Sequence, residues 1–181
     1  MFARLVVTAL VVLAAATSAG AAGQPENLQV FRDVQRQVLQ YPHFTIFDSV
    51  SAQVDNGTVI LIGKVTMPYK KNDIERRVRK LASVERLDNR IEVLPVSQFD
   101  DDLRFRIARA IYSNPNFRPF ATMVNPPIHI IVERGRVTLE GVVNSQVDRM
   151  LARSIASNFL AFDVKNALKT EAEVKAELEK L

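Results

Sequence analysis

Val54-Asp55-Asn56-Gly57-Thr58-Val59-Ile60-Leu61-Ile62-Gly63-Lys64-Val65 decides the fold, because the same pattern returns 78 residues later. The second copy is Val132-Glu133-Arg134-Gly135-Arg136-Val137-Thr138-Leu139-Glu140-Gly141-Val142-Val143. Both copies read V-x-x-G-x-V-x-L-x-G-x-V, with six matching positions in the same order. Self-similarity at a fixed offset is the mark of an internally repeated architecture.

Each copy predicts a β-hairpin, because apolar residues alternate with polar ones on both sides of a two-residue turn. Asn56-Gly57 is typical of a type I′ turn, which needs positive φ at both central residues. Arg134 suits that backbone less well than Asn, so Arg134-Gly135 predicts a turn of another type. Gly63 and Gly141 fall inside the second strand of each hairpin. Glycine at such a position indicates a bulge or a close backbone approach, for example by a packed helix.

The flanking segments repeat as well. An apolar residue every fourth position predicts an amphipathic helix before each hairpin, at Val30, Val34 and Val38 and at Leu103, Ile107 and Ile111. A second helix follows each hairpin, with Ile74, Val78 and Leu81 inward in one copy and Val147, Leu151 and Ile155 inward in the other. Third strands close the copies, at residues 87–93 and 164–168. The acidic run 100–102 suits a helix N-terminus; a calcium site is the alternative, but the spaced ligands of known loops are missing.

The predicted fold class is therefore α+β, with two tandem αββαβ units. Each unit is expected to be a three-stranded mixed sheet with two helices on one face, since a helix that links two strands returns the second one parallel. The expected domains are residues 26–96 and residues 100–170. Units of this size have marginal cores, so we expect the two to pack on each other.

Both ends of the chain carry separate signals. Residues 1–22 read as a cleavable signal peptide: Arg4 is followed by an apolar stretch and then by small residues with an Ala-x-Ala pattern. A membrane anchor is the alternative, but the apolar stretch is short for a spanning helix. There is no Cys for lipid attachment or disulfides. Residues 171–181 predict a C-terminal helical tail that docks on this protein or on a partner.

The repeated G-x-V-x-L-x-G-x-V hairpin, the closing V-x-N-x-L strand and the signal peptide together resemble the BON family of bacterial envelope proteins. The resemblance covers Val30 to about Thr170. It implies a periplasmic, non-catalytic protein that binds phospholipid or another hydrophobic or anionic surface and is linked to osmotic stress or envelope integrity. The chain departs from the repeat by a five-residue insertion near Arg118 to Thr122.

Two segments are candidate sites for anionic lipid. The first is the basic helix that follows the first hairpin, which carries Lys70, Lys71, Arg76, Arg77, Arg79 and Lys80. Cations near an anionic membrane each contribute about 1 kcal/mol; the alternative is a solvated helix face balanced by Asp73 and Glu75. The second is the insertion, where Arg118, Phe120 and Met123 could lie at a membrane interface. Phe120 and Met123 could equally fold inward, as expected for Phe117.

The sequence predicts no enzyme, no cofactor and no metal site. His43 and His129 are the only histidines and lack the spacing of metal ligands. His129 lies between inward Ile128 and Ile130, so it should point to the opposite face of its strand. No nucleophile motif or phosphate-binding glycine loop is present. The formal charge of +4 permits binding to anionic surfaces, and export makes nucleic acid a poor partner. An envelope protein is the alternative partner, and the sequence leaves the lipid and the oligomeric state open.

Overall fold

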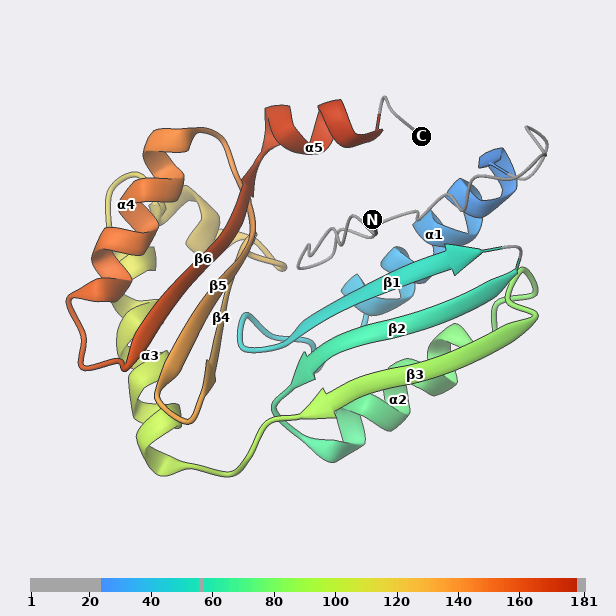
Figure 1. The fold of residues 1–181 in the computed structure, drawn as a ribbon, viewed down its shortest axis with the longest axis horizontal. Helices are drawn as coiled ribbons and strands as arrows, with labels where there is room; N and C mark the ends of the chain where they lie inside the picture. The colour runs from blue at the N-terminus through green and yellow to red at the C-terminus, as the bar shows by residue number, and fades with distance from the viewer. Residues whose placement is uncertain (1–23, 56, 179–181) are drawn as a thin grey trace.

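The computed structural model describes residues 24–55 and 57–178. The first unit contains α1 (Gln24–Leu39), β1 (Ser49–Asp55), β2 (Thr58–Val65), α2 (Pro68–Val78) and β3 (Arg86–Val93). The second contains α3 (Gln98–Ser113), the 3₁₀ helix η1 (Arg118–Thr122), β4 (Ile128–Glu133), β5 (Arg136–Val143), α4 (Gln146–Ser157) and β6 (Asp163–Thr170). Helix α5 (Glu171–Leu178) follows (Figure 1). The predicted signal peptide, residues 1–22, lies outside the described residues, as do Asn56 and residues 179–181.

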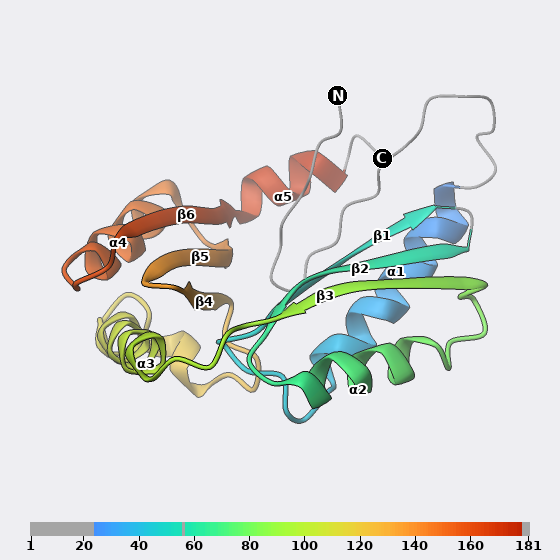
Figure 2. The same cartoon turned by 60° about the horizontal axis from the view of Figure 1, so that its bottom comes forward.

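The two units have the same topology. Their sheets have the orders β1-β2-β3 and β4-β5-β6. In each, the first pair of strands is antiparallel and the second pair is parallel. The two helices of each unit cover one face of its sheet, and the other face has no helix of its own unit (Figure 2). The predicted α+β class with two tandem units is confirmed.

Each unit has its own hydrophobic core, built from the alternating strand residues and the helix stripes. Leu61, Ile74 and Ile91 are fully buried in the first core. In the second core, Leu139 and Leu168 hold the places of Leu61 and Ile91. Burying a side chain of this size contributes about 1.5–3 kcal/mol, so two repeats of one apolar pattern stabilise two separate cores.

The second hairpin turn corrects a prediction. Arg134 and Gly135 have φ values of 51° and 72°, so both central residues are positive, as a type I′ turn requires. The expectation of a different turn type is wrong. The Asp100 carboxylate accepts the backbone N–H groups of Arg134 at 2.8 Å and of Gly135 at 2.7 Å. Asp100 thus stabilises the turn, while Ser97 caps helix α3 by accepting the N–H of Asp100.

Gly63 allows two strand backbones to approach closely. A Cβ atom at this position would lie 2.0 Å from the carbonyl oxygen of Ser49, and its φ is +143°. Strand pairing continues without interruption through Val50 and Gly63, so there is no bulge here. The approaching backbone belongs to β1. The sequence-based suggestion that a packed helix approaches Gly63 is therefore wrong.

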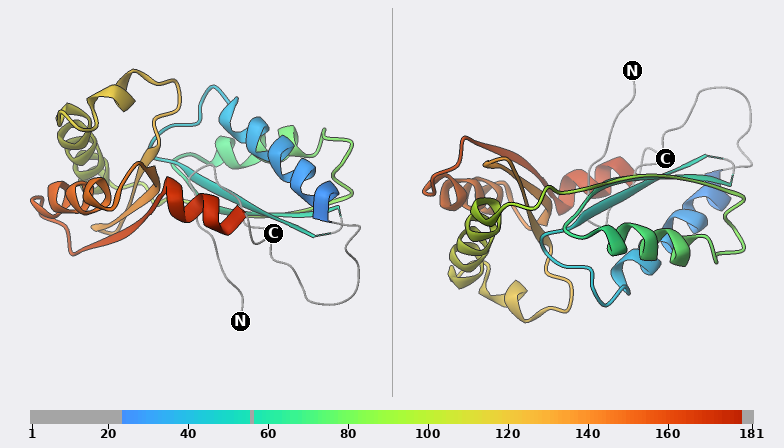
Figure 3. Two further views of the ribbon diagram at one scale, coloured as in Figure 1. Left: turned by 90° about the horizontal axis from the view of Figure 1, so that it is seen from above. Right: turned by 90° about the horizontal axis from the view of Figure 1, so that it is seen from below.

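The two units pack on each other, as expected, and the first unit covers an edge of the second (Figure 3). The 45–48 segment, which leads into β1, lies along the free edge of β4, where the Ile46 carbonyl accepts the N–H of Ile130 at 2.7 Å. The Phe47 ring meets the ring of Phe105 edge-on, with centroids 4.8 Å apart. Farther along the same edge, Arg104 donates to the carbonyl of Val132 at 3.0 Å. Backbone groups that would otherwise invite another strand are therefore occupied.

Helix α5 docks on the second unit. Val174 is buried. Arg149 forms an ion pair with Glu173 at 3.0 Å, and Lys169 forms one with Glu177 at 3.0 Å. The tail is thus helical over its described part, and these contacts with its own chain hold it in place.

Candidate functional site

The basic helix is α2, and Lys70 does not belong to its exposed face. Lys70 is 4% exposed, and its Nζ lies 2.6 Å from Oδ2 of Asp48. It also donates to Oγ1 of Thr66 at 2.7 Å. The expectation that Lys70 contributes to a surface for anions is wrong, because a buried carboxylate from the preceding loop neutralises it.

The arginines of α2 are also engaged. Arg76 pairs with Asp73, and Arg79 pairs with Glu75 at 2.6 Å. Arg77 donates to the backbone carbonyls of Gln37 and Gln40 in the first unit. Lys71 is half-buried, while Lys80 is exposed. This arrangement fits the alternative interpretation, a helix face whose charges are largely balanced by its own acidic residues.

The insertion forms η1 and divides the three residues that the sequence grouped there. Arg118 is exposed. Phe120 is half-buried and packs against the second core, with its ring stacked 6.4 Å from that of Phe117. Met123 is 49% exposed. Phe117 is fully buried, as expected. Arg118 and Met123 remain available to a surface ligand, whereas Phe120 is held by the core.

A cluster that sequence reasoning missed lies at the β4–β5 turn. Phe99, Leu160 and Phe162 are 53%, 85% and 81% exposed. A Cβ atom at Gly135 would lie 2.6 Å from the Phe162 ring and 3.4 Å from the Phe99 ring, so both rings flank this turn. Leu160 stands two residues before Phe162 in the same loop. We call Phe99, Leu160 and Phe162 the apolar end.

The missed signal was present in the sequence. Phe99 lies four residues before Leu103 and so extends the apolar stripe of α3 toward the N-terminus. Phe162 comes just before β6 and extends the alternation of that strand in the same direction. Both patterns are typical of core positions. The sheet ends before it reaches these residues, so the rings stay outside the core. The outer surfaces of α3 and α4 add Phe105, Val147 and Met150, all exposed. The expectation that Val147 points inward is wrong, because α4 turns Ala152 and Ala156 to the core instead.

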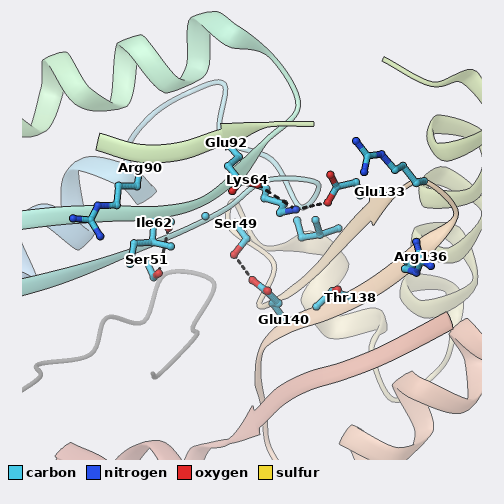
Figure 4. Close-up of a pocket in the computed structure, with 13 residues that line it drawn as sticks. Ser49, Ser51, Ile62, Lys64, Arg90, Glu92, Glu133, Arg136, Thr138 and Glu140 are labelled. Atoms are coloured by element: carbon cyan, nitrogen blue, oxygen red, sulfur yellow. Dashed lines mark hydrogen bonds and ion pairs between the residues drawn. The ribbon is translucent and has the colours of Figure 1, made fainter. Parts of the chain in front are cut away.

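A cleft of about 390 Å³ separates the uncovered faces of the two sheets. Figure 4 shows strands of both units around it. The Oγ of Ser49 donates to the carboxylate of Glu140 across the cleft. The Lys64 ammonium pairs with Glu133 of the other unit and lies 3.4 Å from Glu92 of its own. Burial raises the pKa of Glu140, against a smaller lowering effect of the Ser49 hydrogen bond.

His129 is buried where the units meet, on the face of β4 opposite to Ile128 and Ile130. Its Nδ1 donates to the backbone carbonyl of Asp48 at 2.5 Å, since a carbonyl oxygen can only accept. The ring of Phe44 packs on it with centroids 5.5 Å apart. Desolvation by burial lowers the pKa of His129 to about 4. The histidine is thus a neutral component of the interface between the units.

This pKa predicts a pH-dependent stability. Between about pH 6.5 and pH 4 the unfolded chain binds a proton at His129 that the folded chain does not, so the free energy of unfolding falls by about 3 kcal/mol as the pH drops through this window. The variant His129→Phe should lose this part of the slope. Urea unfolding of both proteins at half-unit pH steps measures it. Equal slopes in the two proteins would contradict the assignment, because the carboxylates are common to both.

Two kinds of site are absent from the described parts of the chain. In residues 24–55 and 57–178, no three acidic or histidine side chains gather as a metal site would require. No helix in the same ranges is both long enough and apolar enough to cross a membrane.

Comparison with known proteins adds a family and two distant structures. The family model described as BON domain matches residues 30–95 and 99–172, which is more than half of the chain. No curated protein matches the chain. Among solved structures, the C-terminal domain of CdsD, a structural protein of the type III secretion system of Chlamydia trachomatis, is 19% identical, with a TM-score of 0.32 over 84% of this chain and 70% of that one. A second CdsD structure is 14% identical, with a TM-score of 0.28 over 83% and 97%. TM-scores this low carry no functional information.

Proposed function

We propose that this chain, which belongs to the BON family, is an exported envelope protein that binds anionic phospholipid through the apolar end of its second unit. BON domains are generally non-catalytic, envelope-associated binding or scaffold modules. The lipid, the cleavage of residues 1–22 and the periplasmic location belong to the proposal.

The observation that carries the proposal is the exposure of large apolar side chains beside arginines. Phe99 and Phe162 flank a turn that contains the exposed Arg134 and is followed by the exposed Arg136, and Leu160 lies two residues before Phe162. Transfer of apolar surface out of water contributes about 25 cal/mol per Å². Each arginine near anionic headgroups contributes about 1 kcal/mol more. Apolar side chains that enter the interface with cations around them are the arrangement of peripheral membrane proteins.

Co-sedimentation with liposomes tests this proposal. The mature chain should sediment with vesicles that contain phosphatidylglycerol and much less with vesicles of phosphatidylcholine alone. Replacing both Leu160 and Phe162 with serine should weaken binding to the anionic vesicles at least tenfold, because the two most exposed side chains of the apolar end are removed. Neither residue is in the core, so the unfolding midpoint should not fall.

Two further variants locate the surface. Tyr69→Ser removes a half-exposed aromatic ring from the first unit, outside the apolar end. It serves as the matched control, and binding is expected to be unchanged. Met123→Ser asks whether the insertion contributes. Absence of binding to either kind of vesicle by the folded chain would overturn the lipid proposal. Binding lost through Met123→Ser alone would move the site to the insertion.

A further inference from the structure

We propose that the cleft between the two sheets is a second binding site, for a small solute that carries one phosphate or carboxylate group and several hydroxyl groups. This inference goes beyond membrane binding, because the ligand is soluble and contacts both units.

The shape is that of a small-molecule site. Sites of this kind have volumes of about 300–1,000 Å³ and occur preferentially between domains, and the cleft measures about 390 Å³. Its walls come from β1, β2 and β3 of one unit and from β4, β5 and their turn in the other (Figure 4). Each unit contributes the face of its sheet that no helix of that unit covers. A solute in the cleft would therefore touch both units.

The charges of the cleft favour an anionic group. Its acidic residues already have partners: Glu133 and Glu92 with Lys64, and Glu140 with Ser49. Among its cations, Arg90 is paired with Asp88. Lys64 and Arg90 are therefore balanced by carboxylates, and Glu140 is held by a neutral hydroxyl.

The guanidinium groups of Arg134 and Arg136 are different. Neither forms a hydrogen bond or an ion pair with any other residue in the described ranges 24–55 and 57–178. Both residues line the cleft from the second unit. A guanidinium presents a planar fork of donors that matches phosphate and carboxylate oxygens. Two unpaired guanidinium groups at the β4–β5 turn therefore favour one anionic group at that end of the cleft.

The rest of the lining favours hydroxyl groups rather than a second anion. Ser51 and Thr138 place hydroxyls on opposite walls, and the Ser51 hydroxyl donates to the carbonyl of Ile62, which leaves its oxygen free to accept. Glu133 and Glu140 accept hydrogen bonds from hydroxyls but would repel a further negative charge. Burial also raises the pKa of Glu140, which favours the neutral acid beside an uncharged partner. A polyol with a single acidic group satisfies both ends of the cleft.

The test uses the mature chain and soluble probes without any membrane. Titration with sn-glycerol 3-phosphate, followed by calorimetry and by the thermal unfolding midpoint, should give saturable one-to-one binding with Kd in the millimolar range or tighter. Gluconate tests the carboxylate source of the same chemistry and should also bind. Glycerol and inorganic phosphate each satisfy only one end of the cleft, so they should bind at least tenfold more weakly. A ligand that binds only the folded chain raises its stability, so the midpoint should rise with concentration.

Matched variants assign the site. Arg136→Gln removes an exposed guanidinium that lines the cleft and should weaken binding at least tenfold at an unchanged midpoint without ligand. Arg153→Gln removes an exposed arginine of α4 that does not line the cleft and should leave binding unchanged. No binding of either probe at 10 mM by the folded chain would overturn the inference, and so would equal weakening in both variants. Phosphatidylglycerol vesicles form a separate arm of the test. Vesicle binding without probe binding overturns the cleft site and leaves the membrane proposal standing. Probe binding without vesicle binding overturns the membrane proposal and leaves the cleft site standing.

Discussion

Replacing Asp48 with alanine is expected to lower the free energy of unfolding of the chain by about 3–5 kcal/mol, because it leaves the Lys70 ammonium buried without its counter-charge. The Asp48 side chain is fully buried. It accepts the backbone N–H groups of Thr45 and Thr66, both at 2.8 Å, in addition to the ion pair with Lys70. One carboxylate therefore fixes the loop before β1, the end of β2 and the first turn of α2.

Urea unfolding of the single and double variants measures this effect. Lys70→Met leaves the Asp48 carboxylate with its two backbone donors, so its cost should be smaller than that of Asp48→Ala. The double variant should recover part of the loss, since no unpaired ammonium is then buried, and the coupling energy of the cycle gives the value of the pair in this setting. A loss below about 1 kcal/mol for Asp48→Ala would contradict the assignment of a buried, fully engaged carboxylate.

Gly63→Ala is expected to have an effect of similar size for a different reason. The new Cβ would lie 2.0 Å from the Ser49 carbonyl oxygen and 2.9 Å from the Cα of Val50, and both atoms belong to the backbone of β1. Backbone cannot move aside as a side chain can, so the two strands must separate locally. We expect a loss of more than about 3 kcal/mol, within the range of the most damaging single substitutions.

Gly57→Ala is the matched control for this prediction. Gly57 also has a positive φ, +74°, but its nearest contact at 2.9 Å is the Glu85 side chain, which can swing away. The control should lose about 1–2 kcal/mol, the cost of a left-handed residue with a Cβ. Circular dichroism melts of the two variants give the comparison. Equal losses would mean that the backbone angle, and not the contact with Ser49, explains why glycine occupies position 63.

The fold was largely predictable because its determinants are local and doubled. Alternation around Gly57 and Gly135 identifies the two hairpins, and the four-residue stripes of α1 and α3 identify the helices that cover them. The repeat then supports each prediction twice. The same logic fails at Arg134, because the residue that stabilises its turn is Asp100, 34 residues earlier in the chain. The two turn residues alone give no indication that the Asp100 carboxylate will stabilise them.

The candidate surfaces were less predictable, because they depend on where an element stops and on what a distant loop covers. Lys70 reads as one of six similar cations until the 45–48 segment places Asp48 against it. Phe162 reads as a core residue of β6, but the sheet ends before it. The cleft has no sequence signature of its own, since Arg136 and Lys64 face each other's sheets only after the units have packed. Periodicity describes one element at a time, and these features belong to pairs of elements.

The coverage of the β4 edge has a consequence for biosynthesis. Residues 45–48 are synthesised about 80 residues before β4 begins, so the segment that covers the edge is made before the edge itself. An isolated second unit would lack the 45–48 segment, so the backbone N–H of Ile130 would be free to pair with another extended chain. Pairing of this kind at exposed strand edges is a route to aggregation. The two repeats are therefore not equivalent, because a loop of the first shields the free edge of β4 in the second.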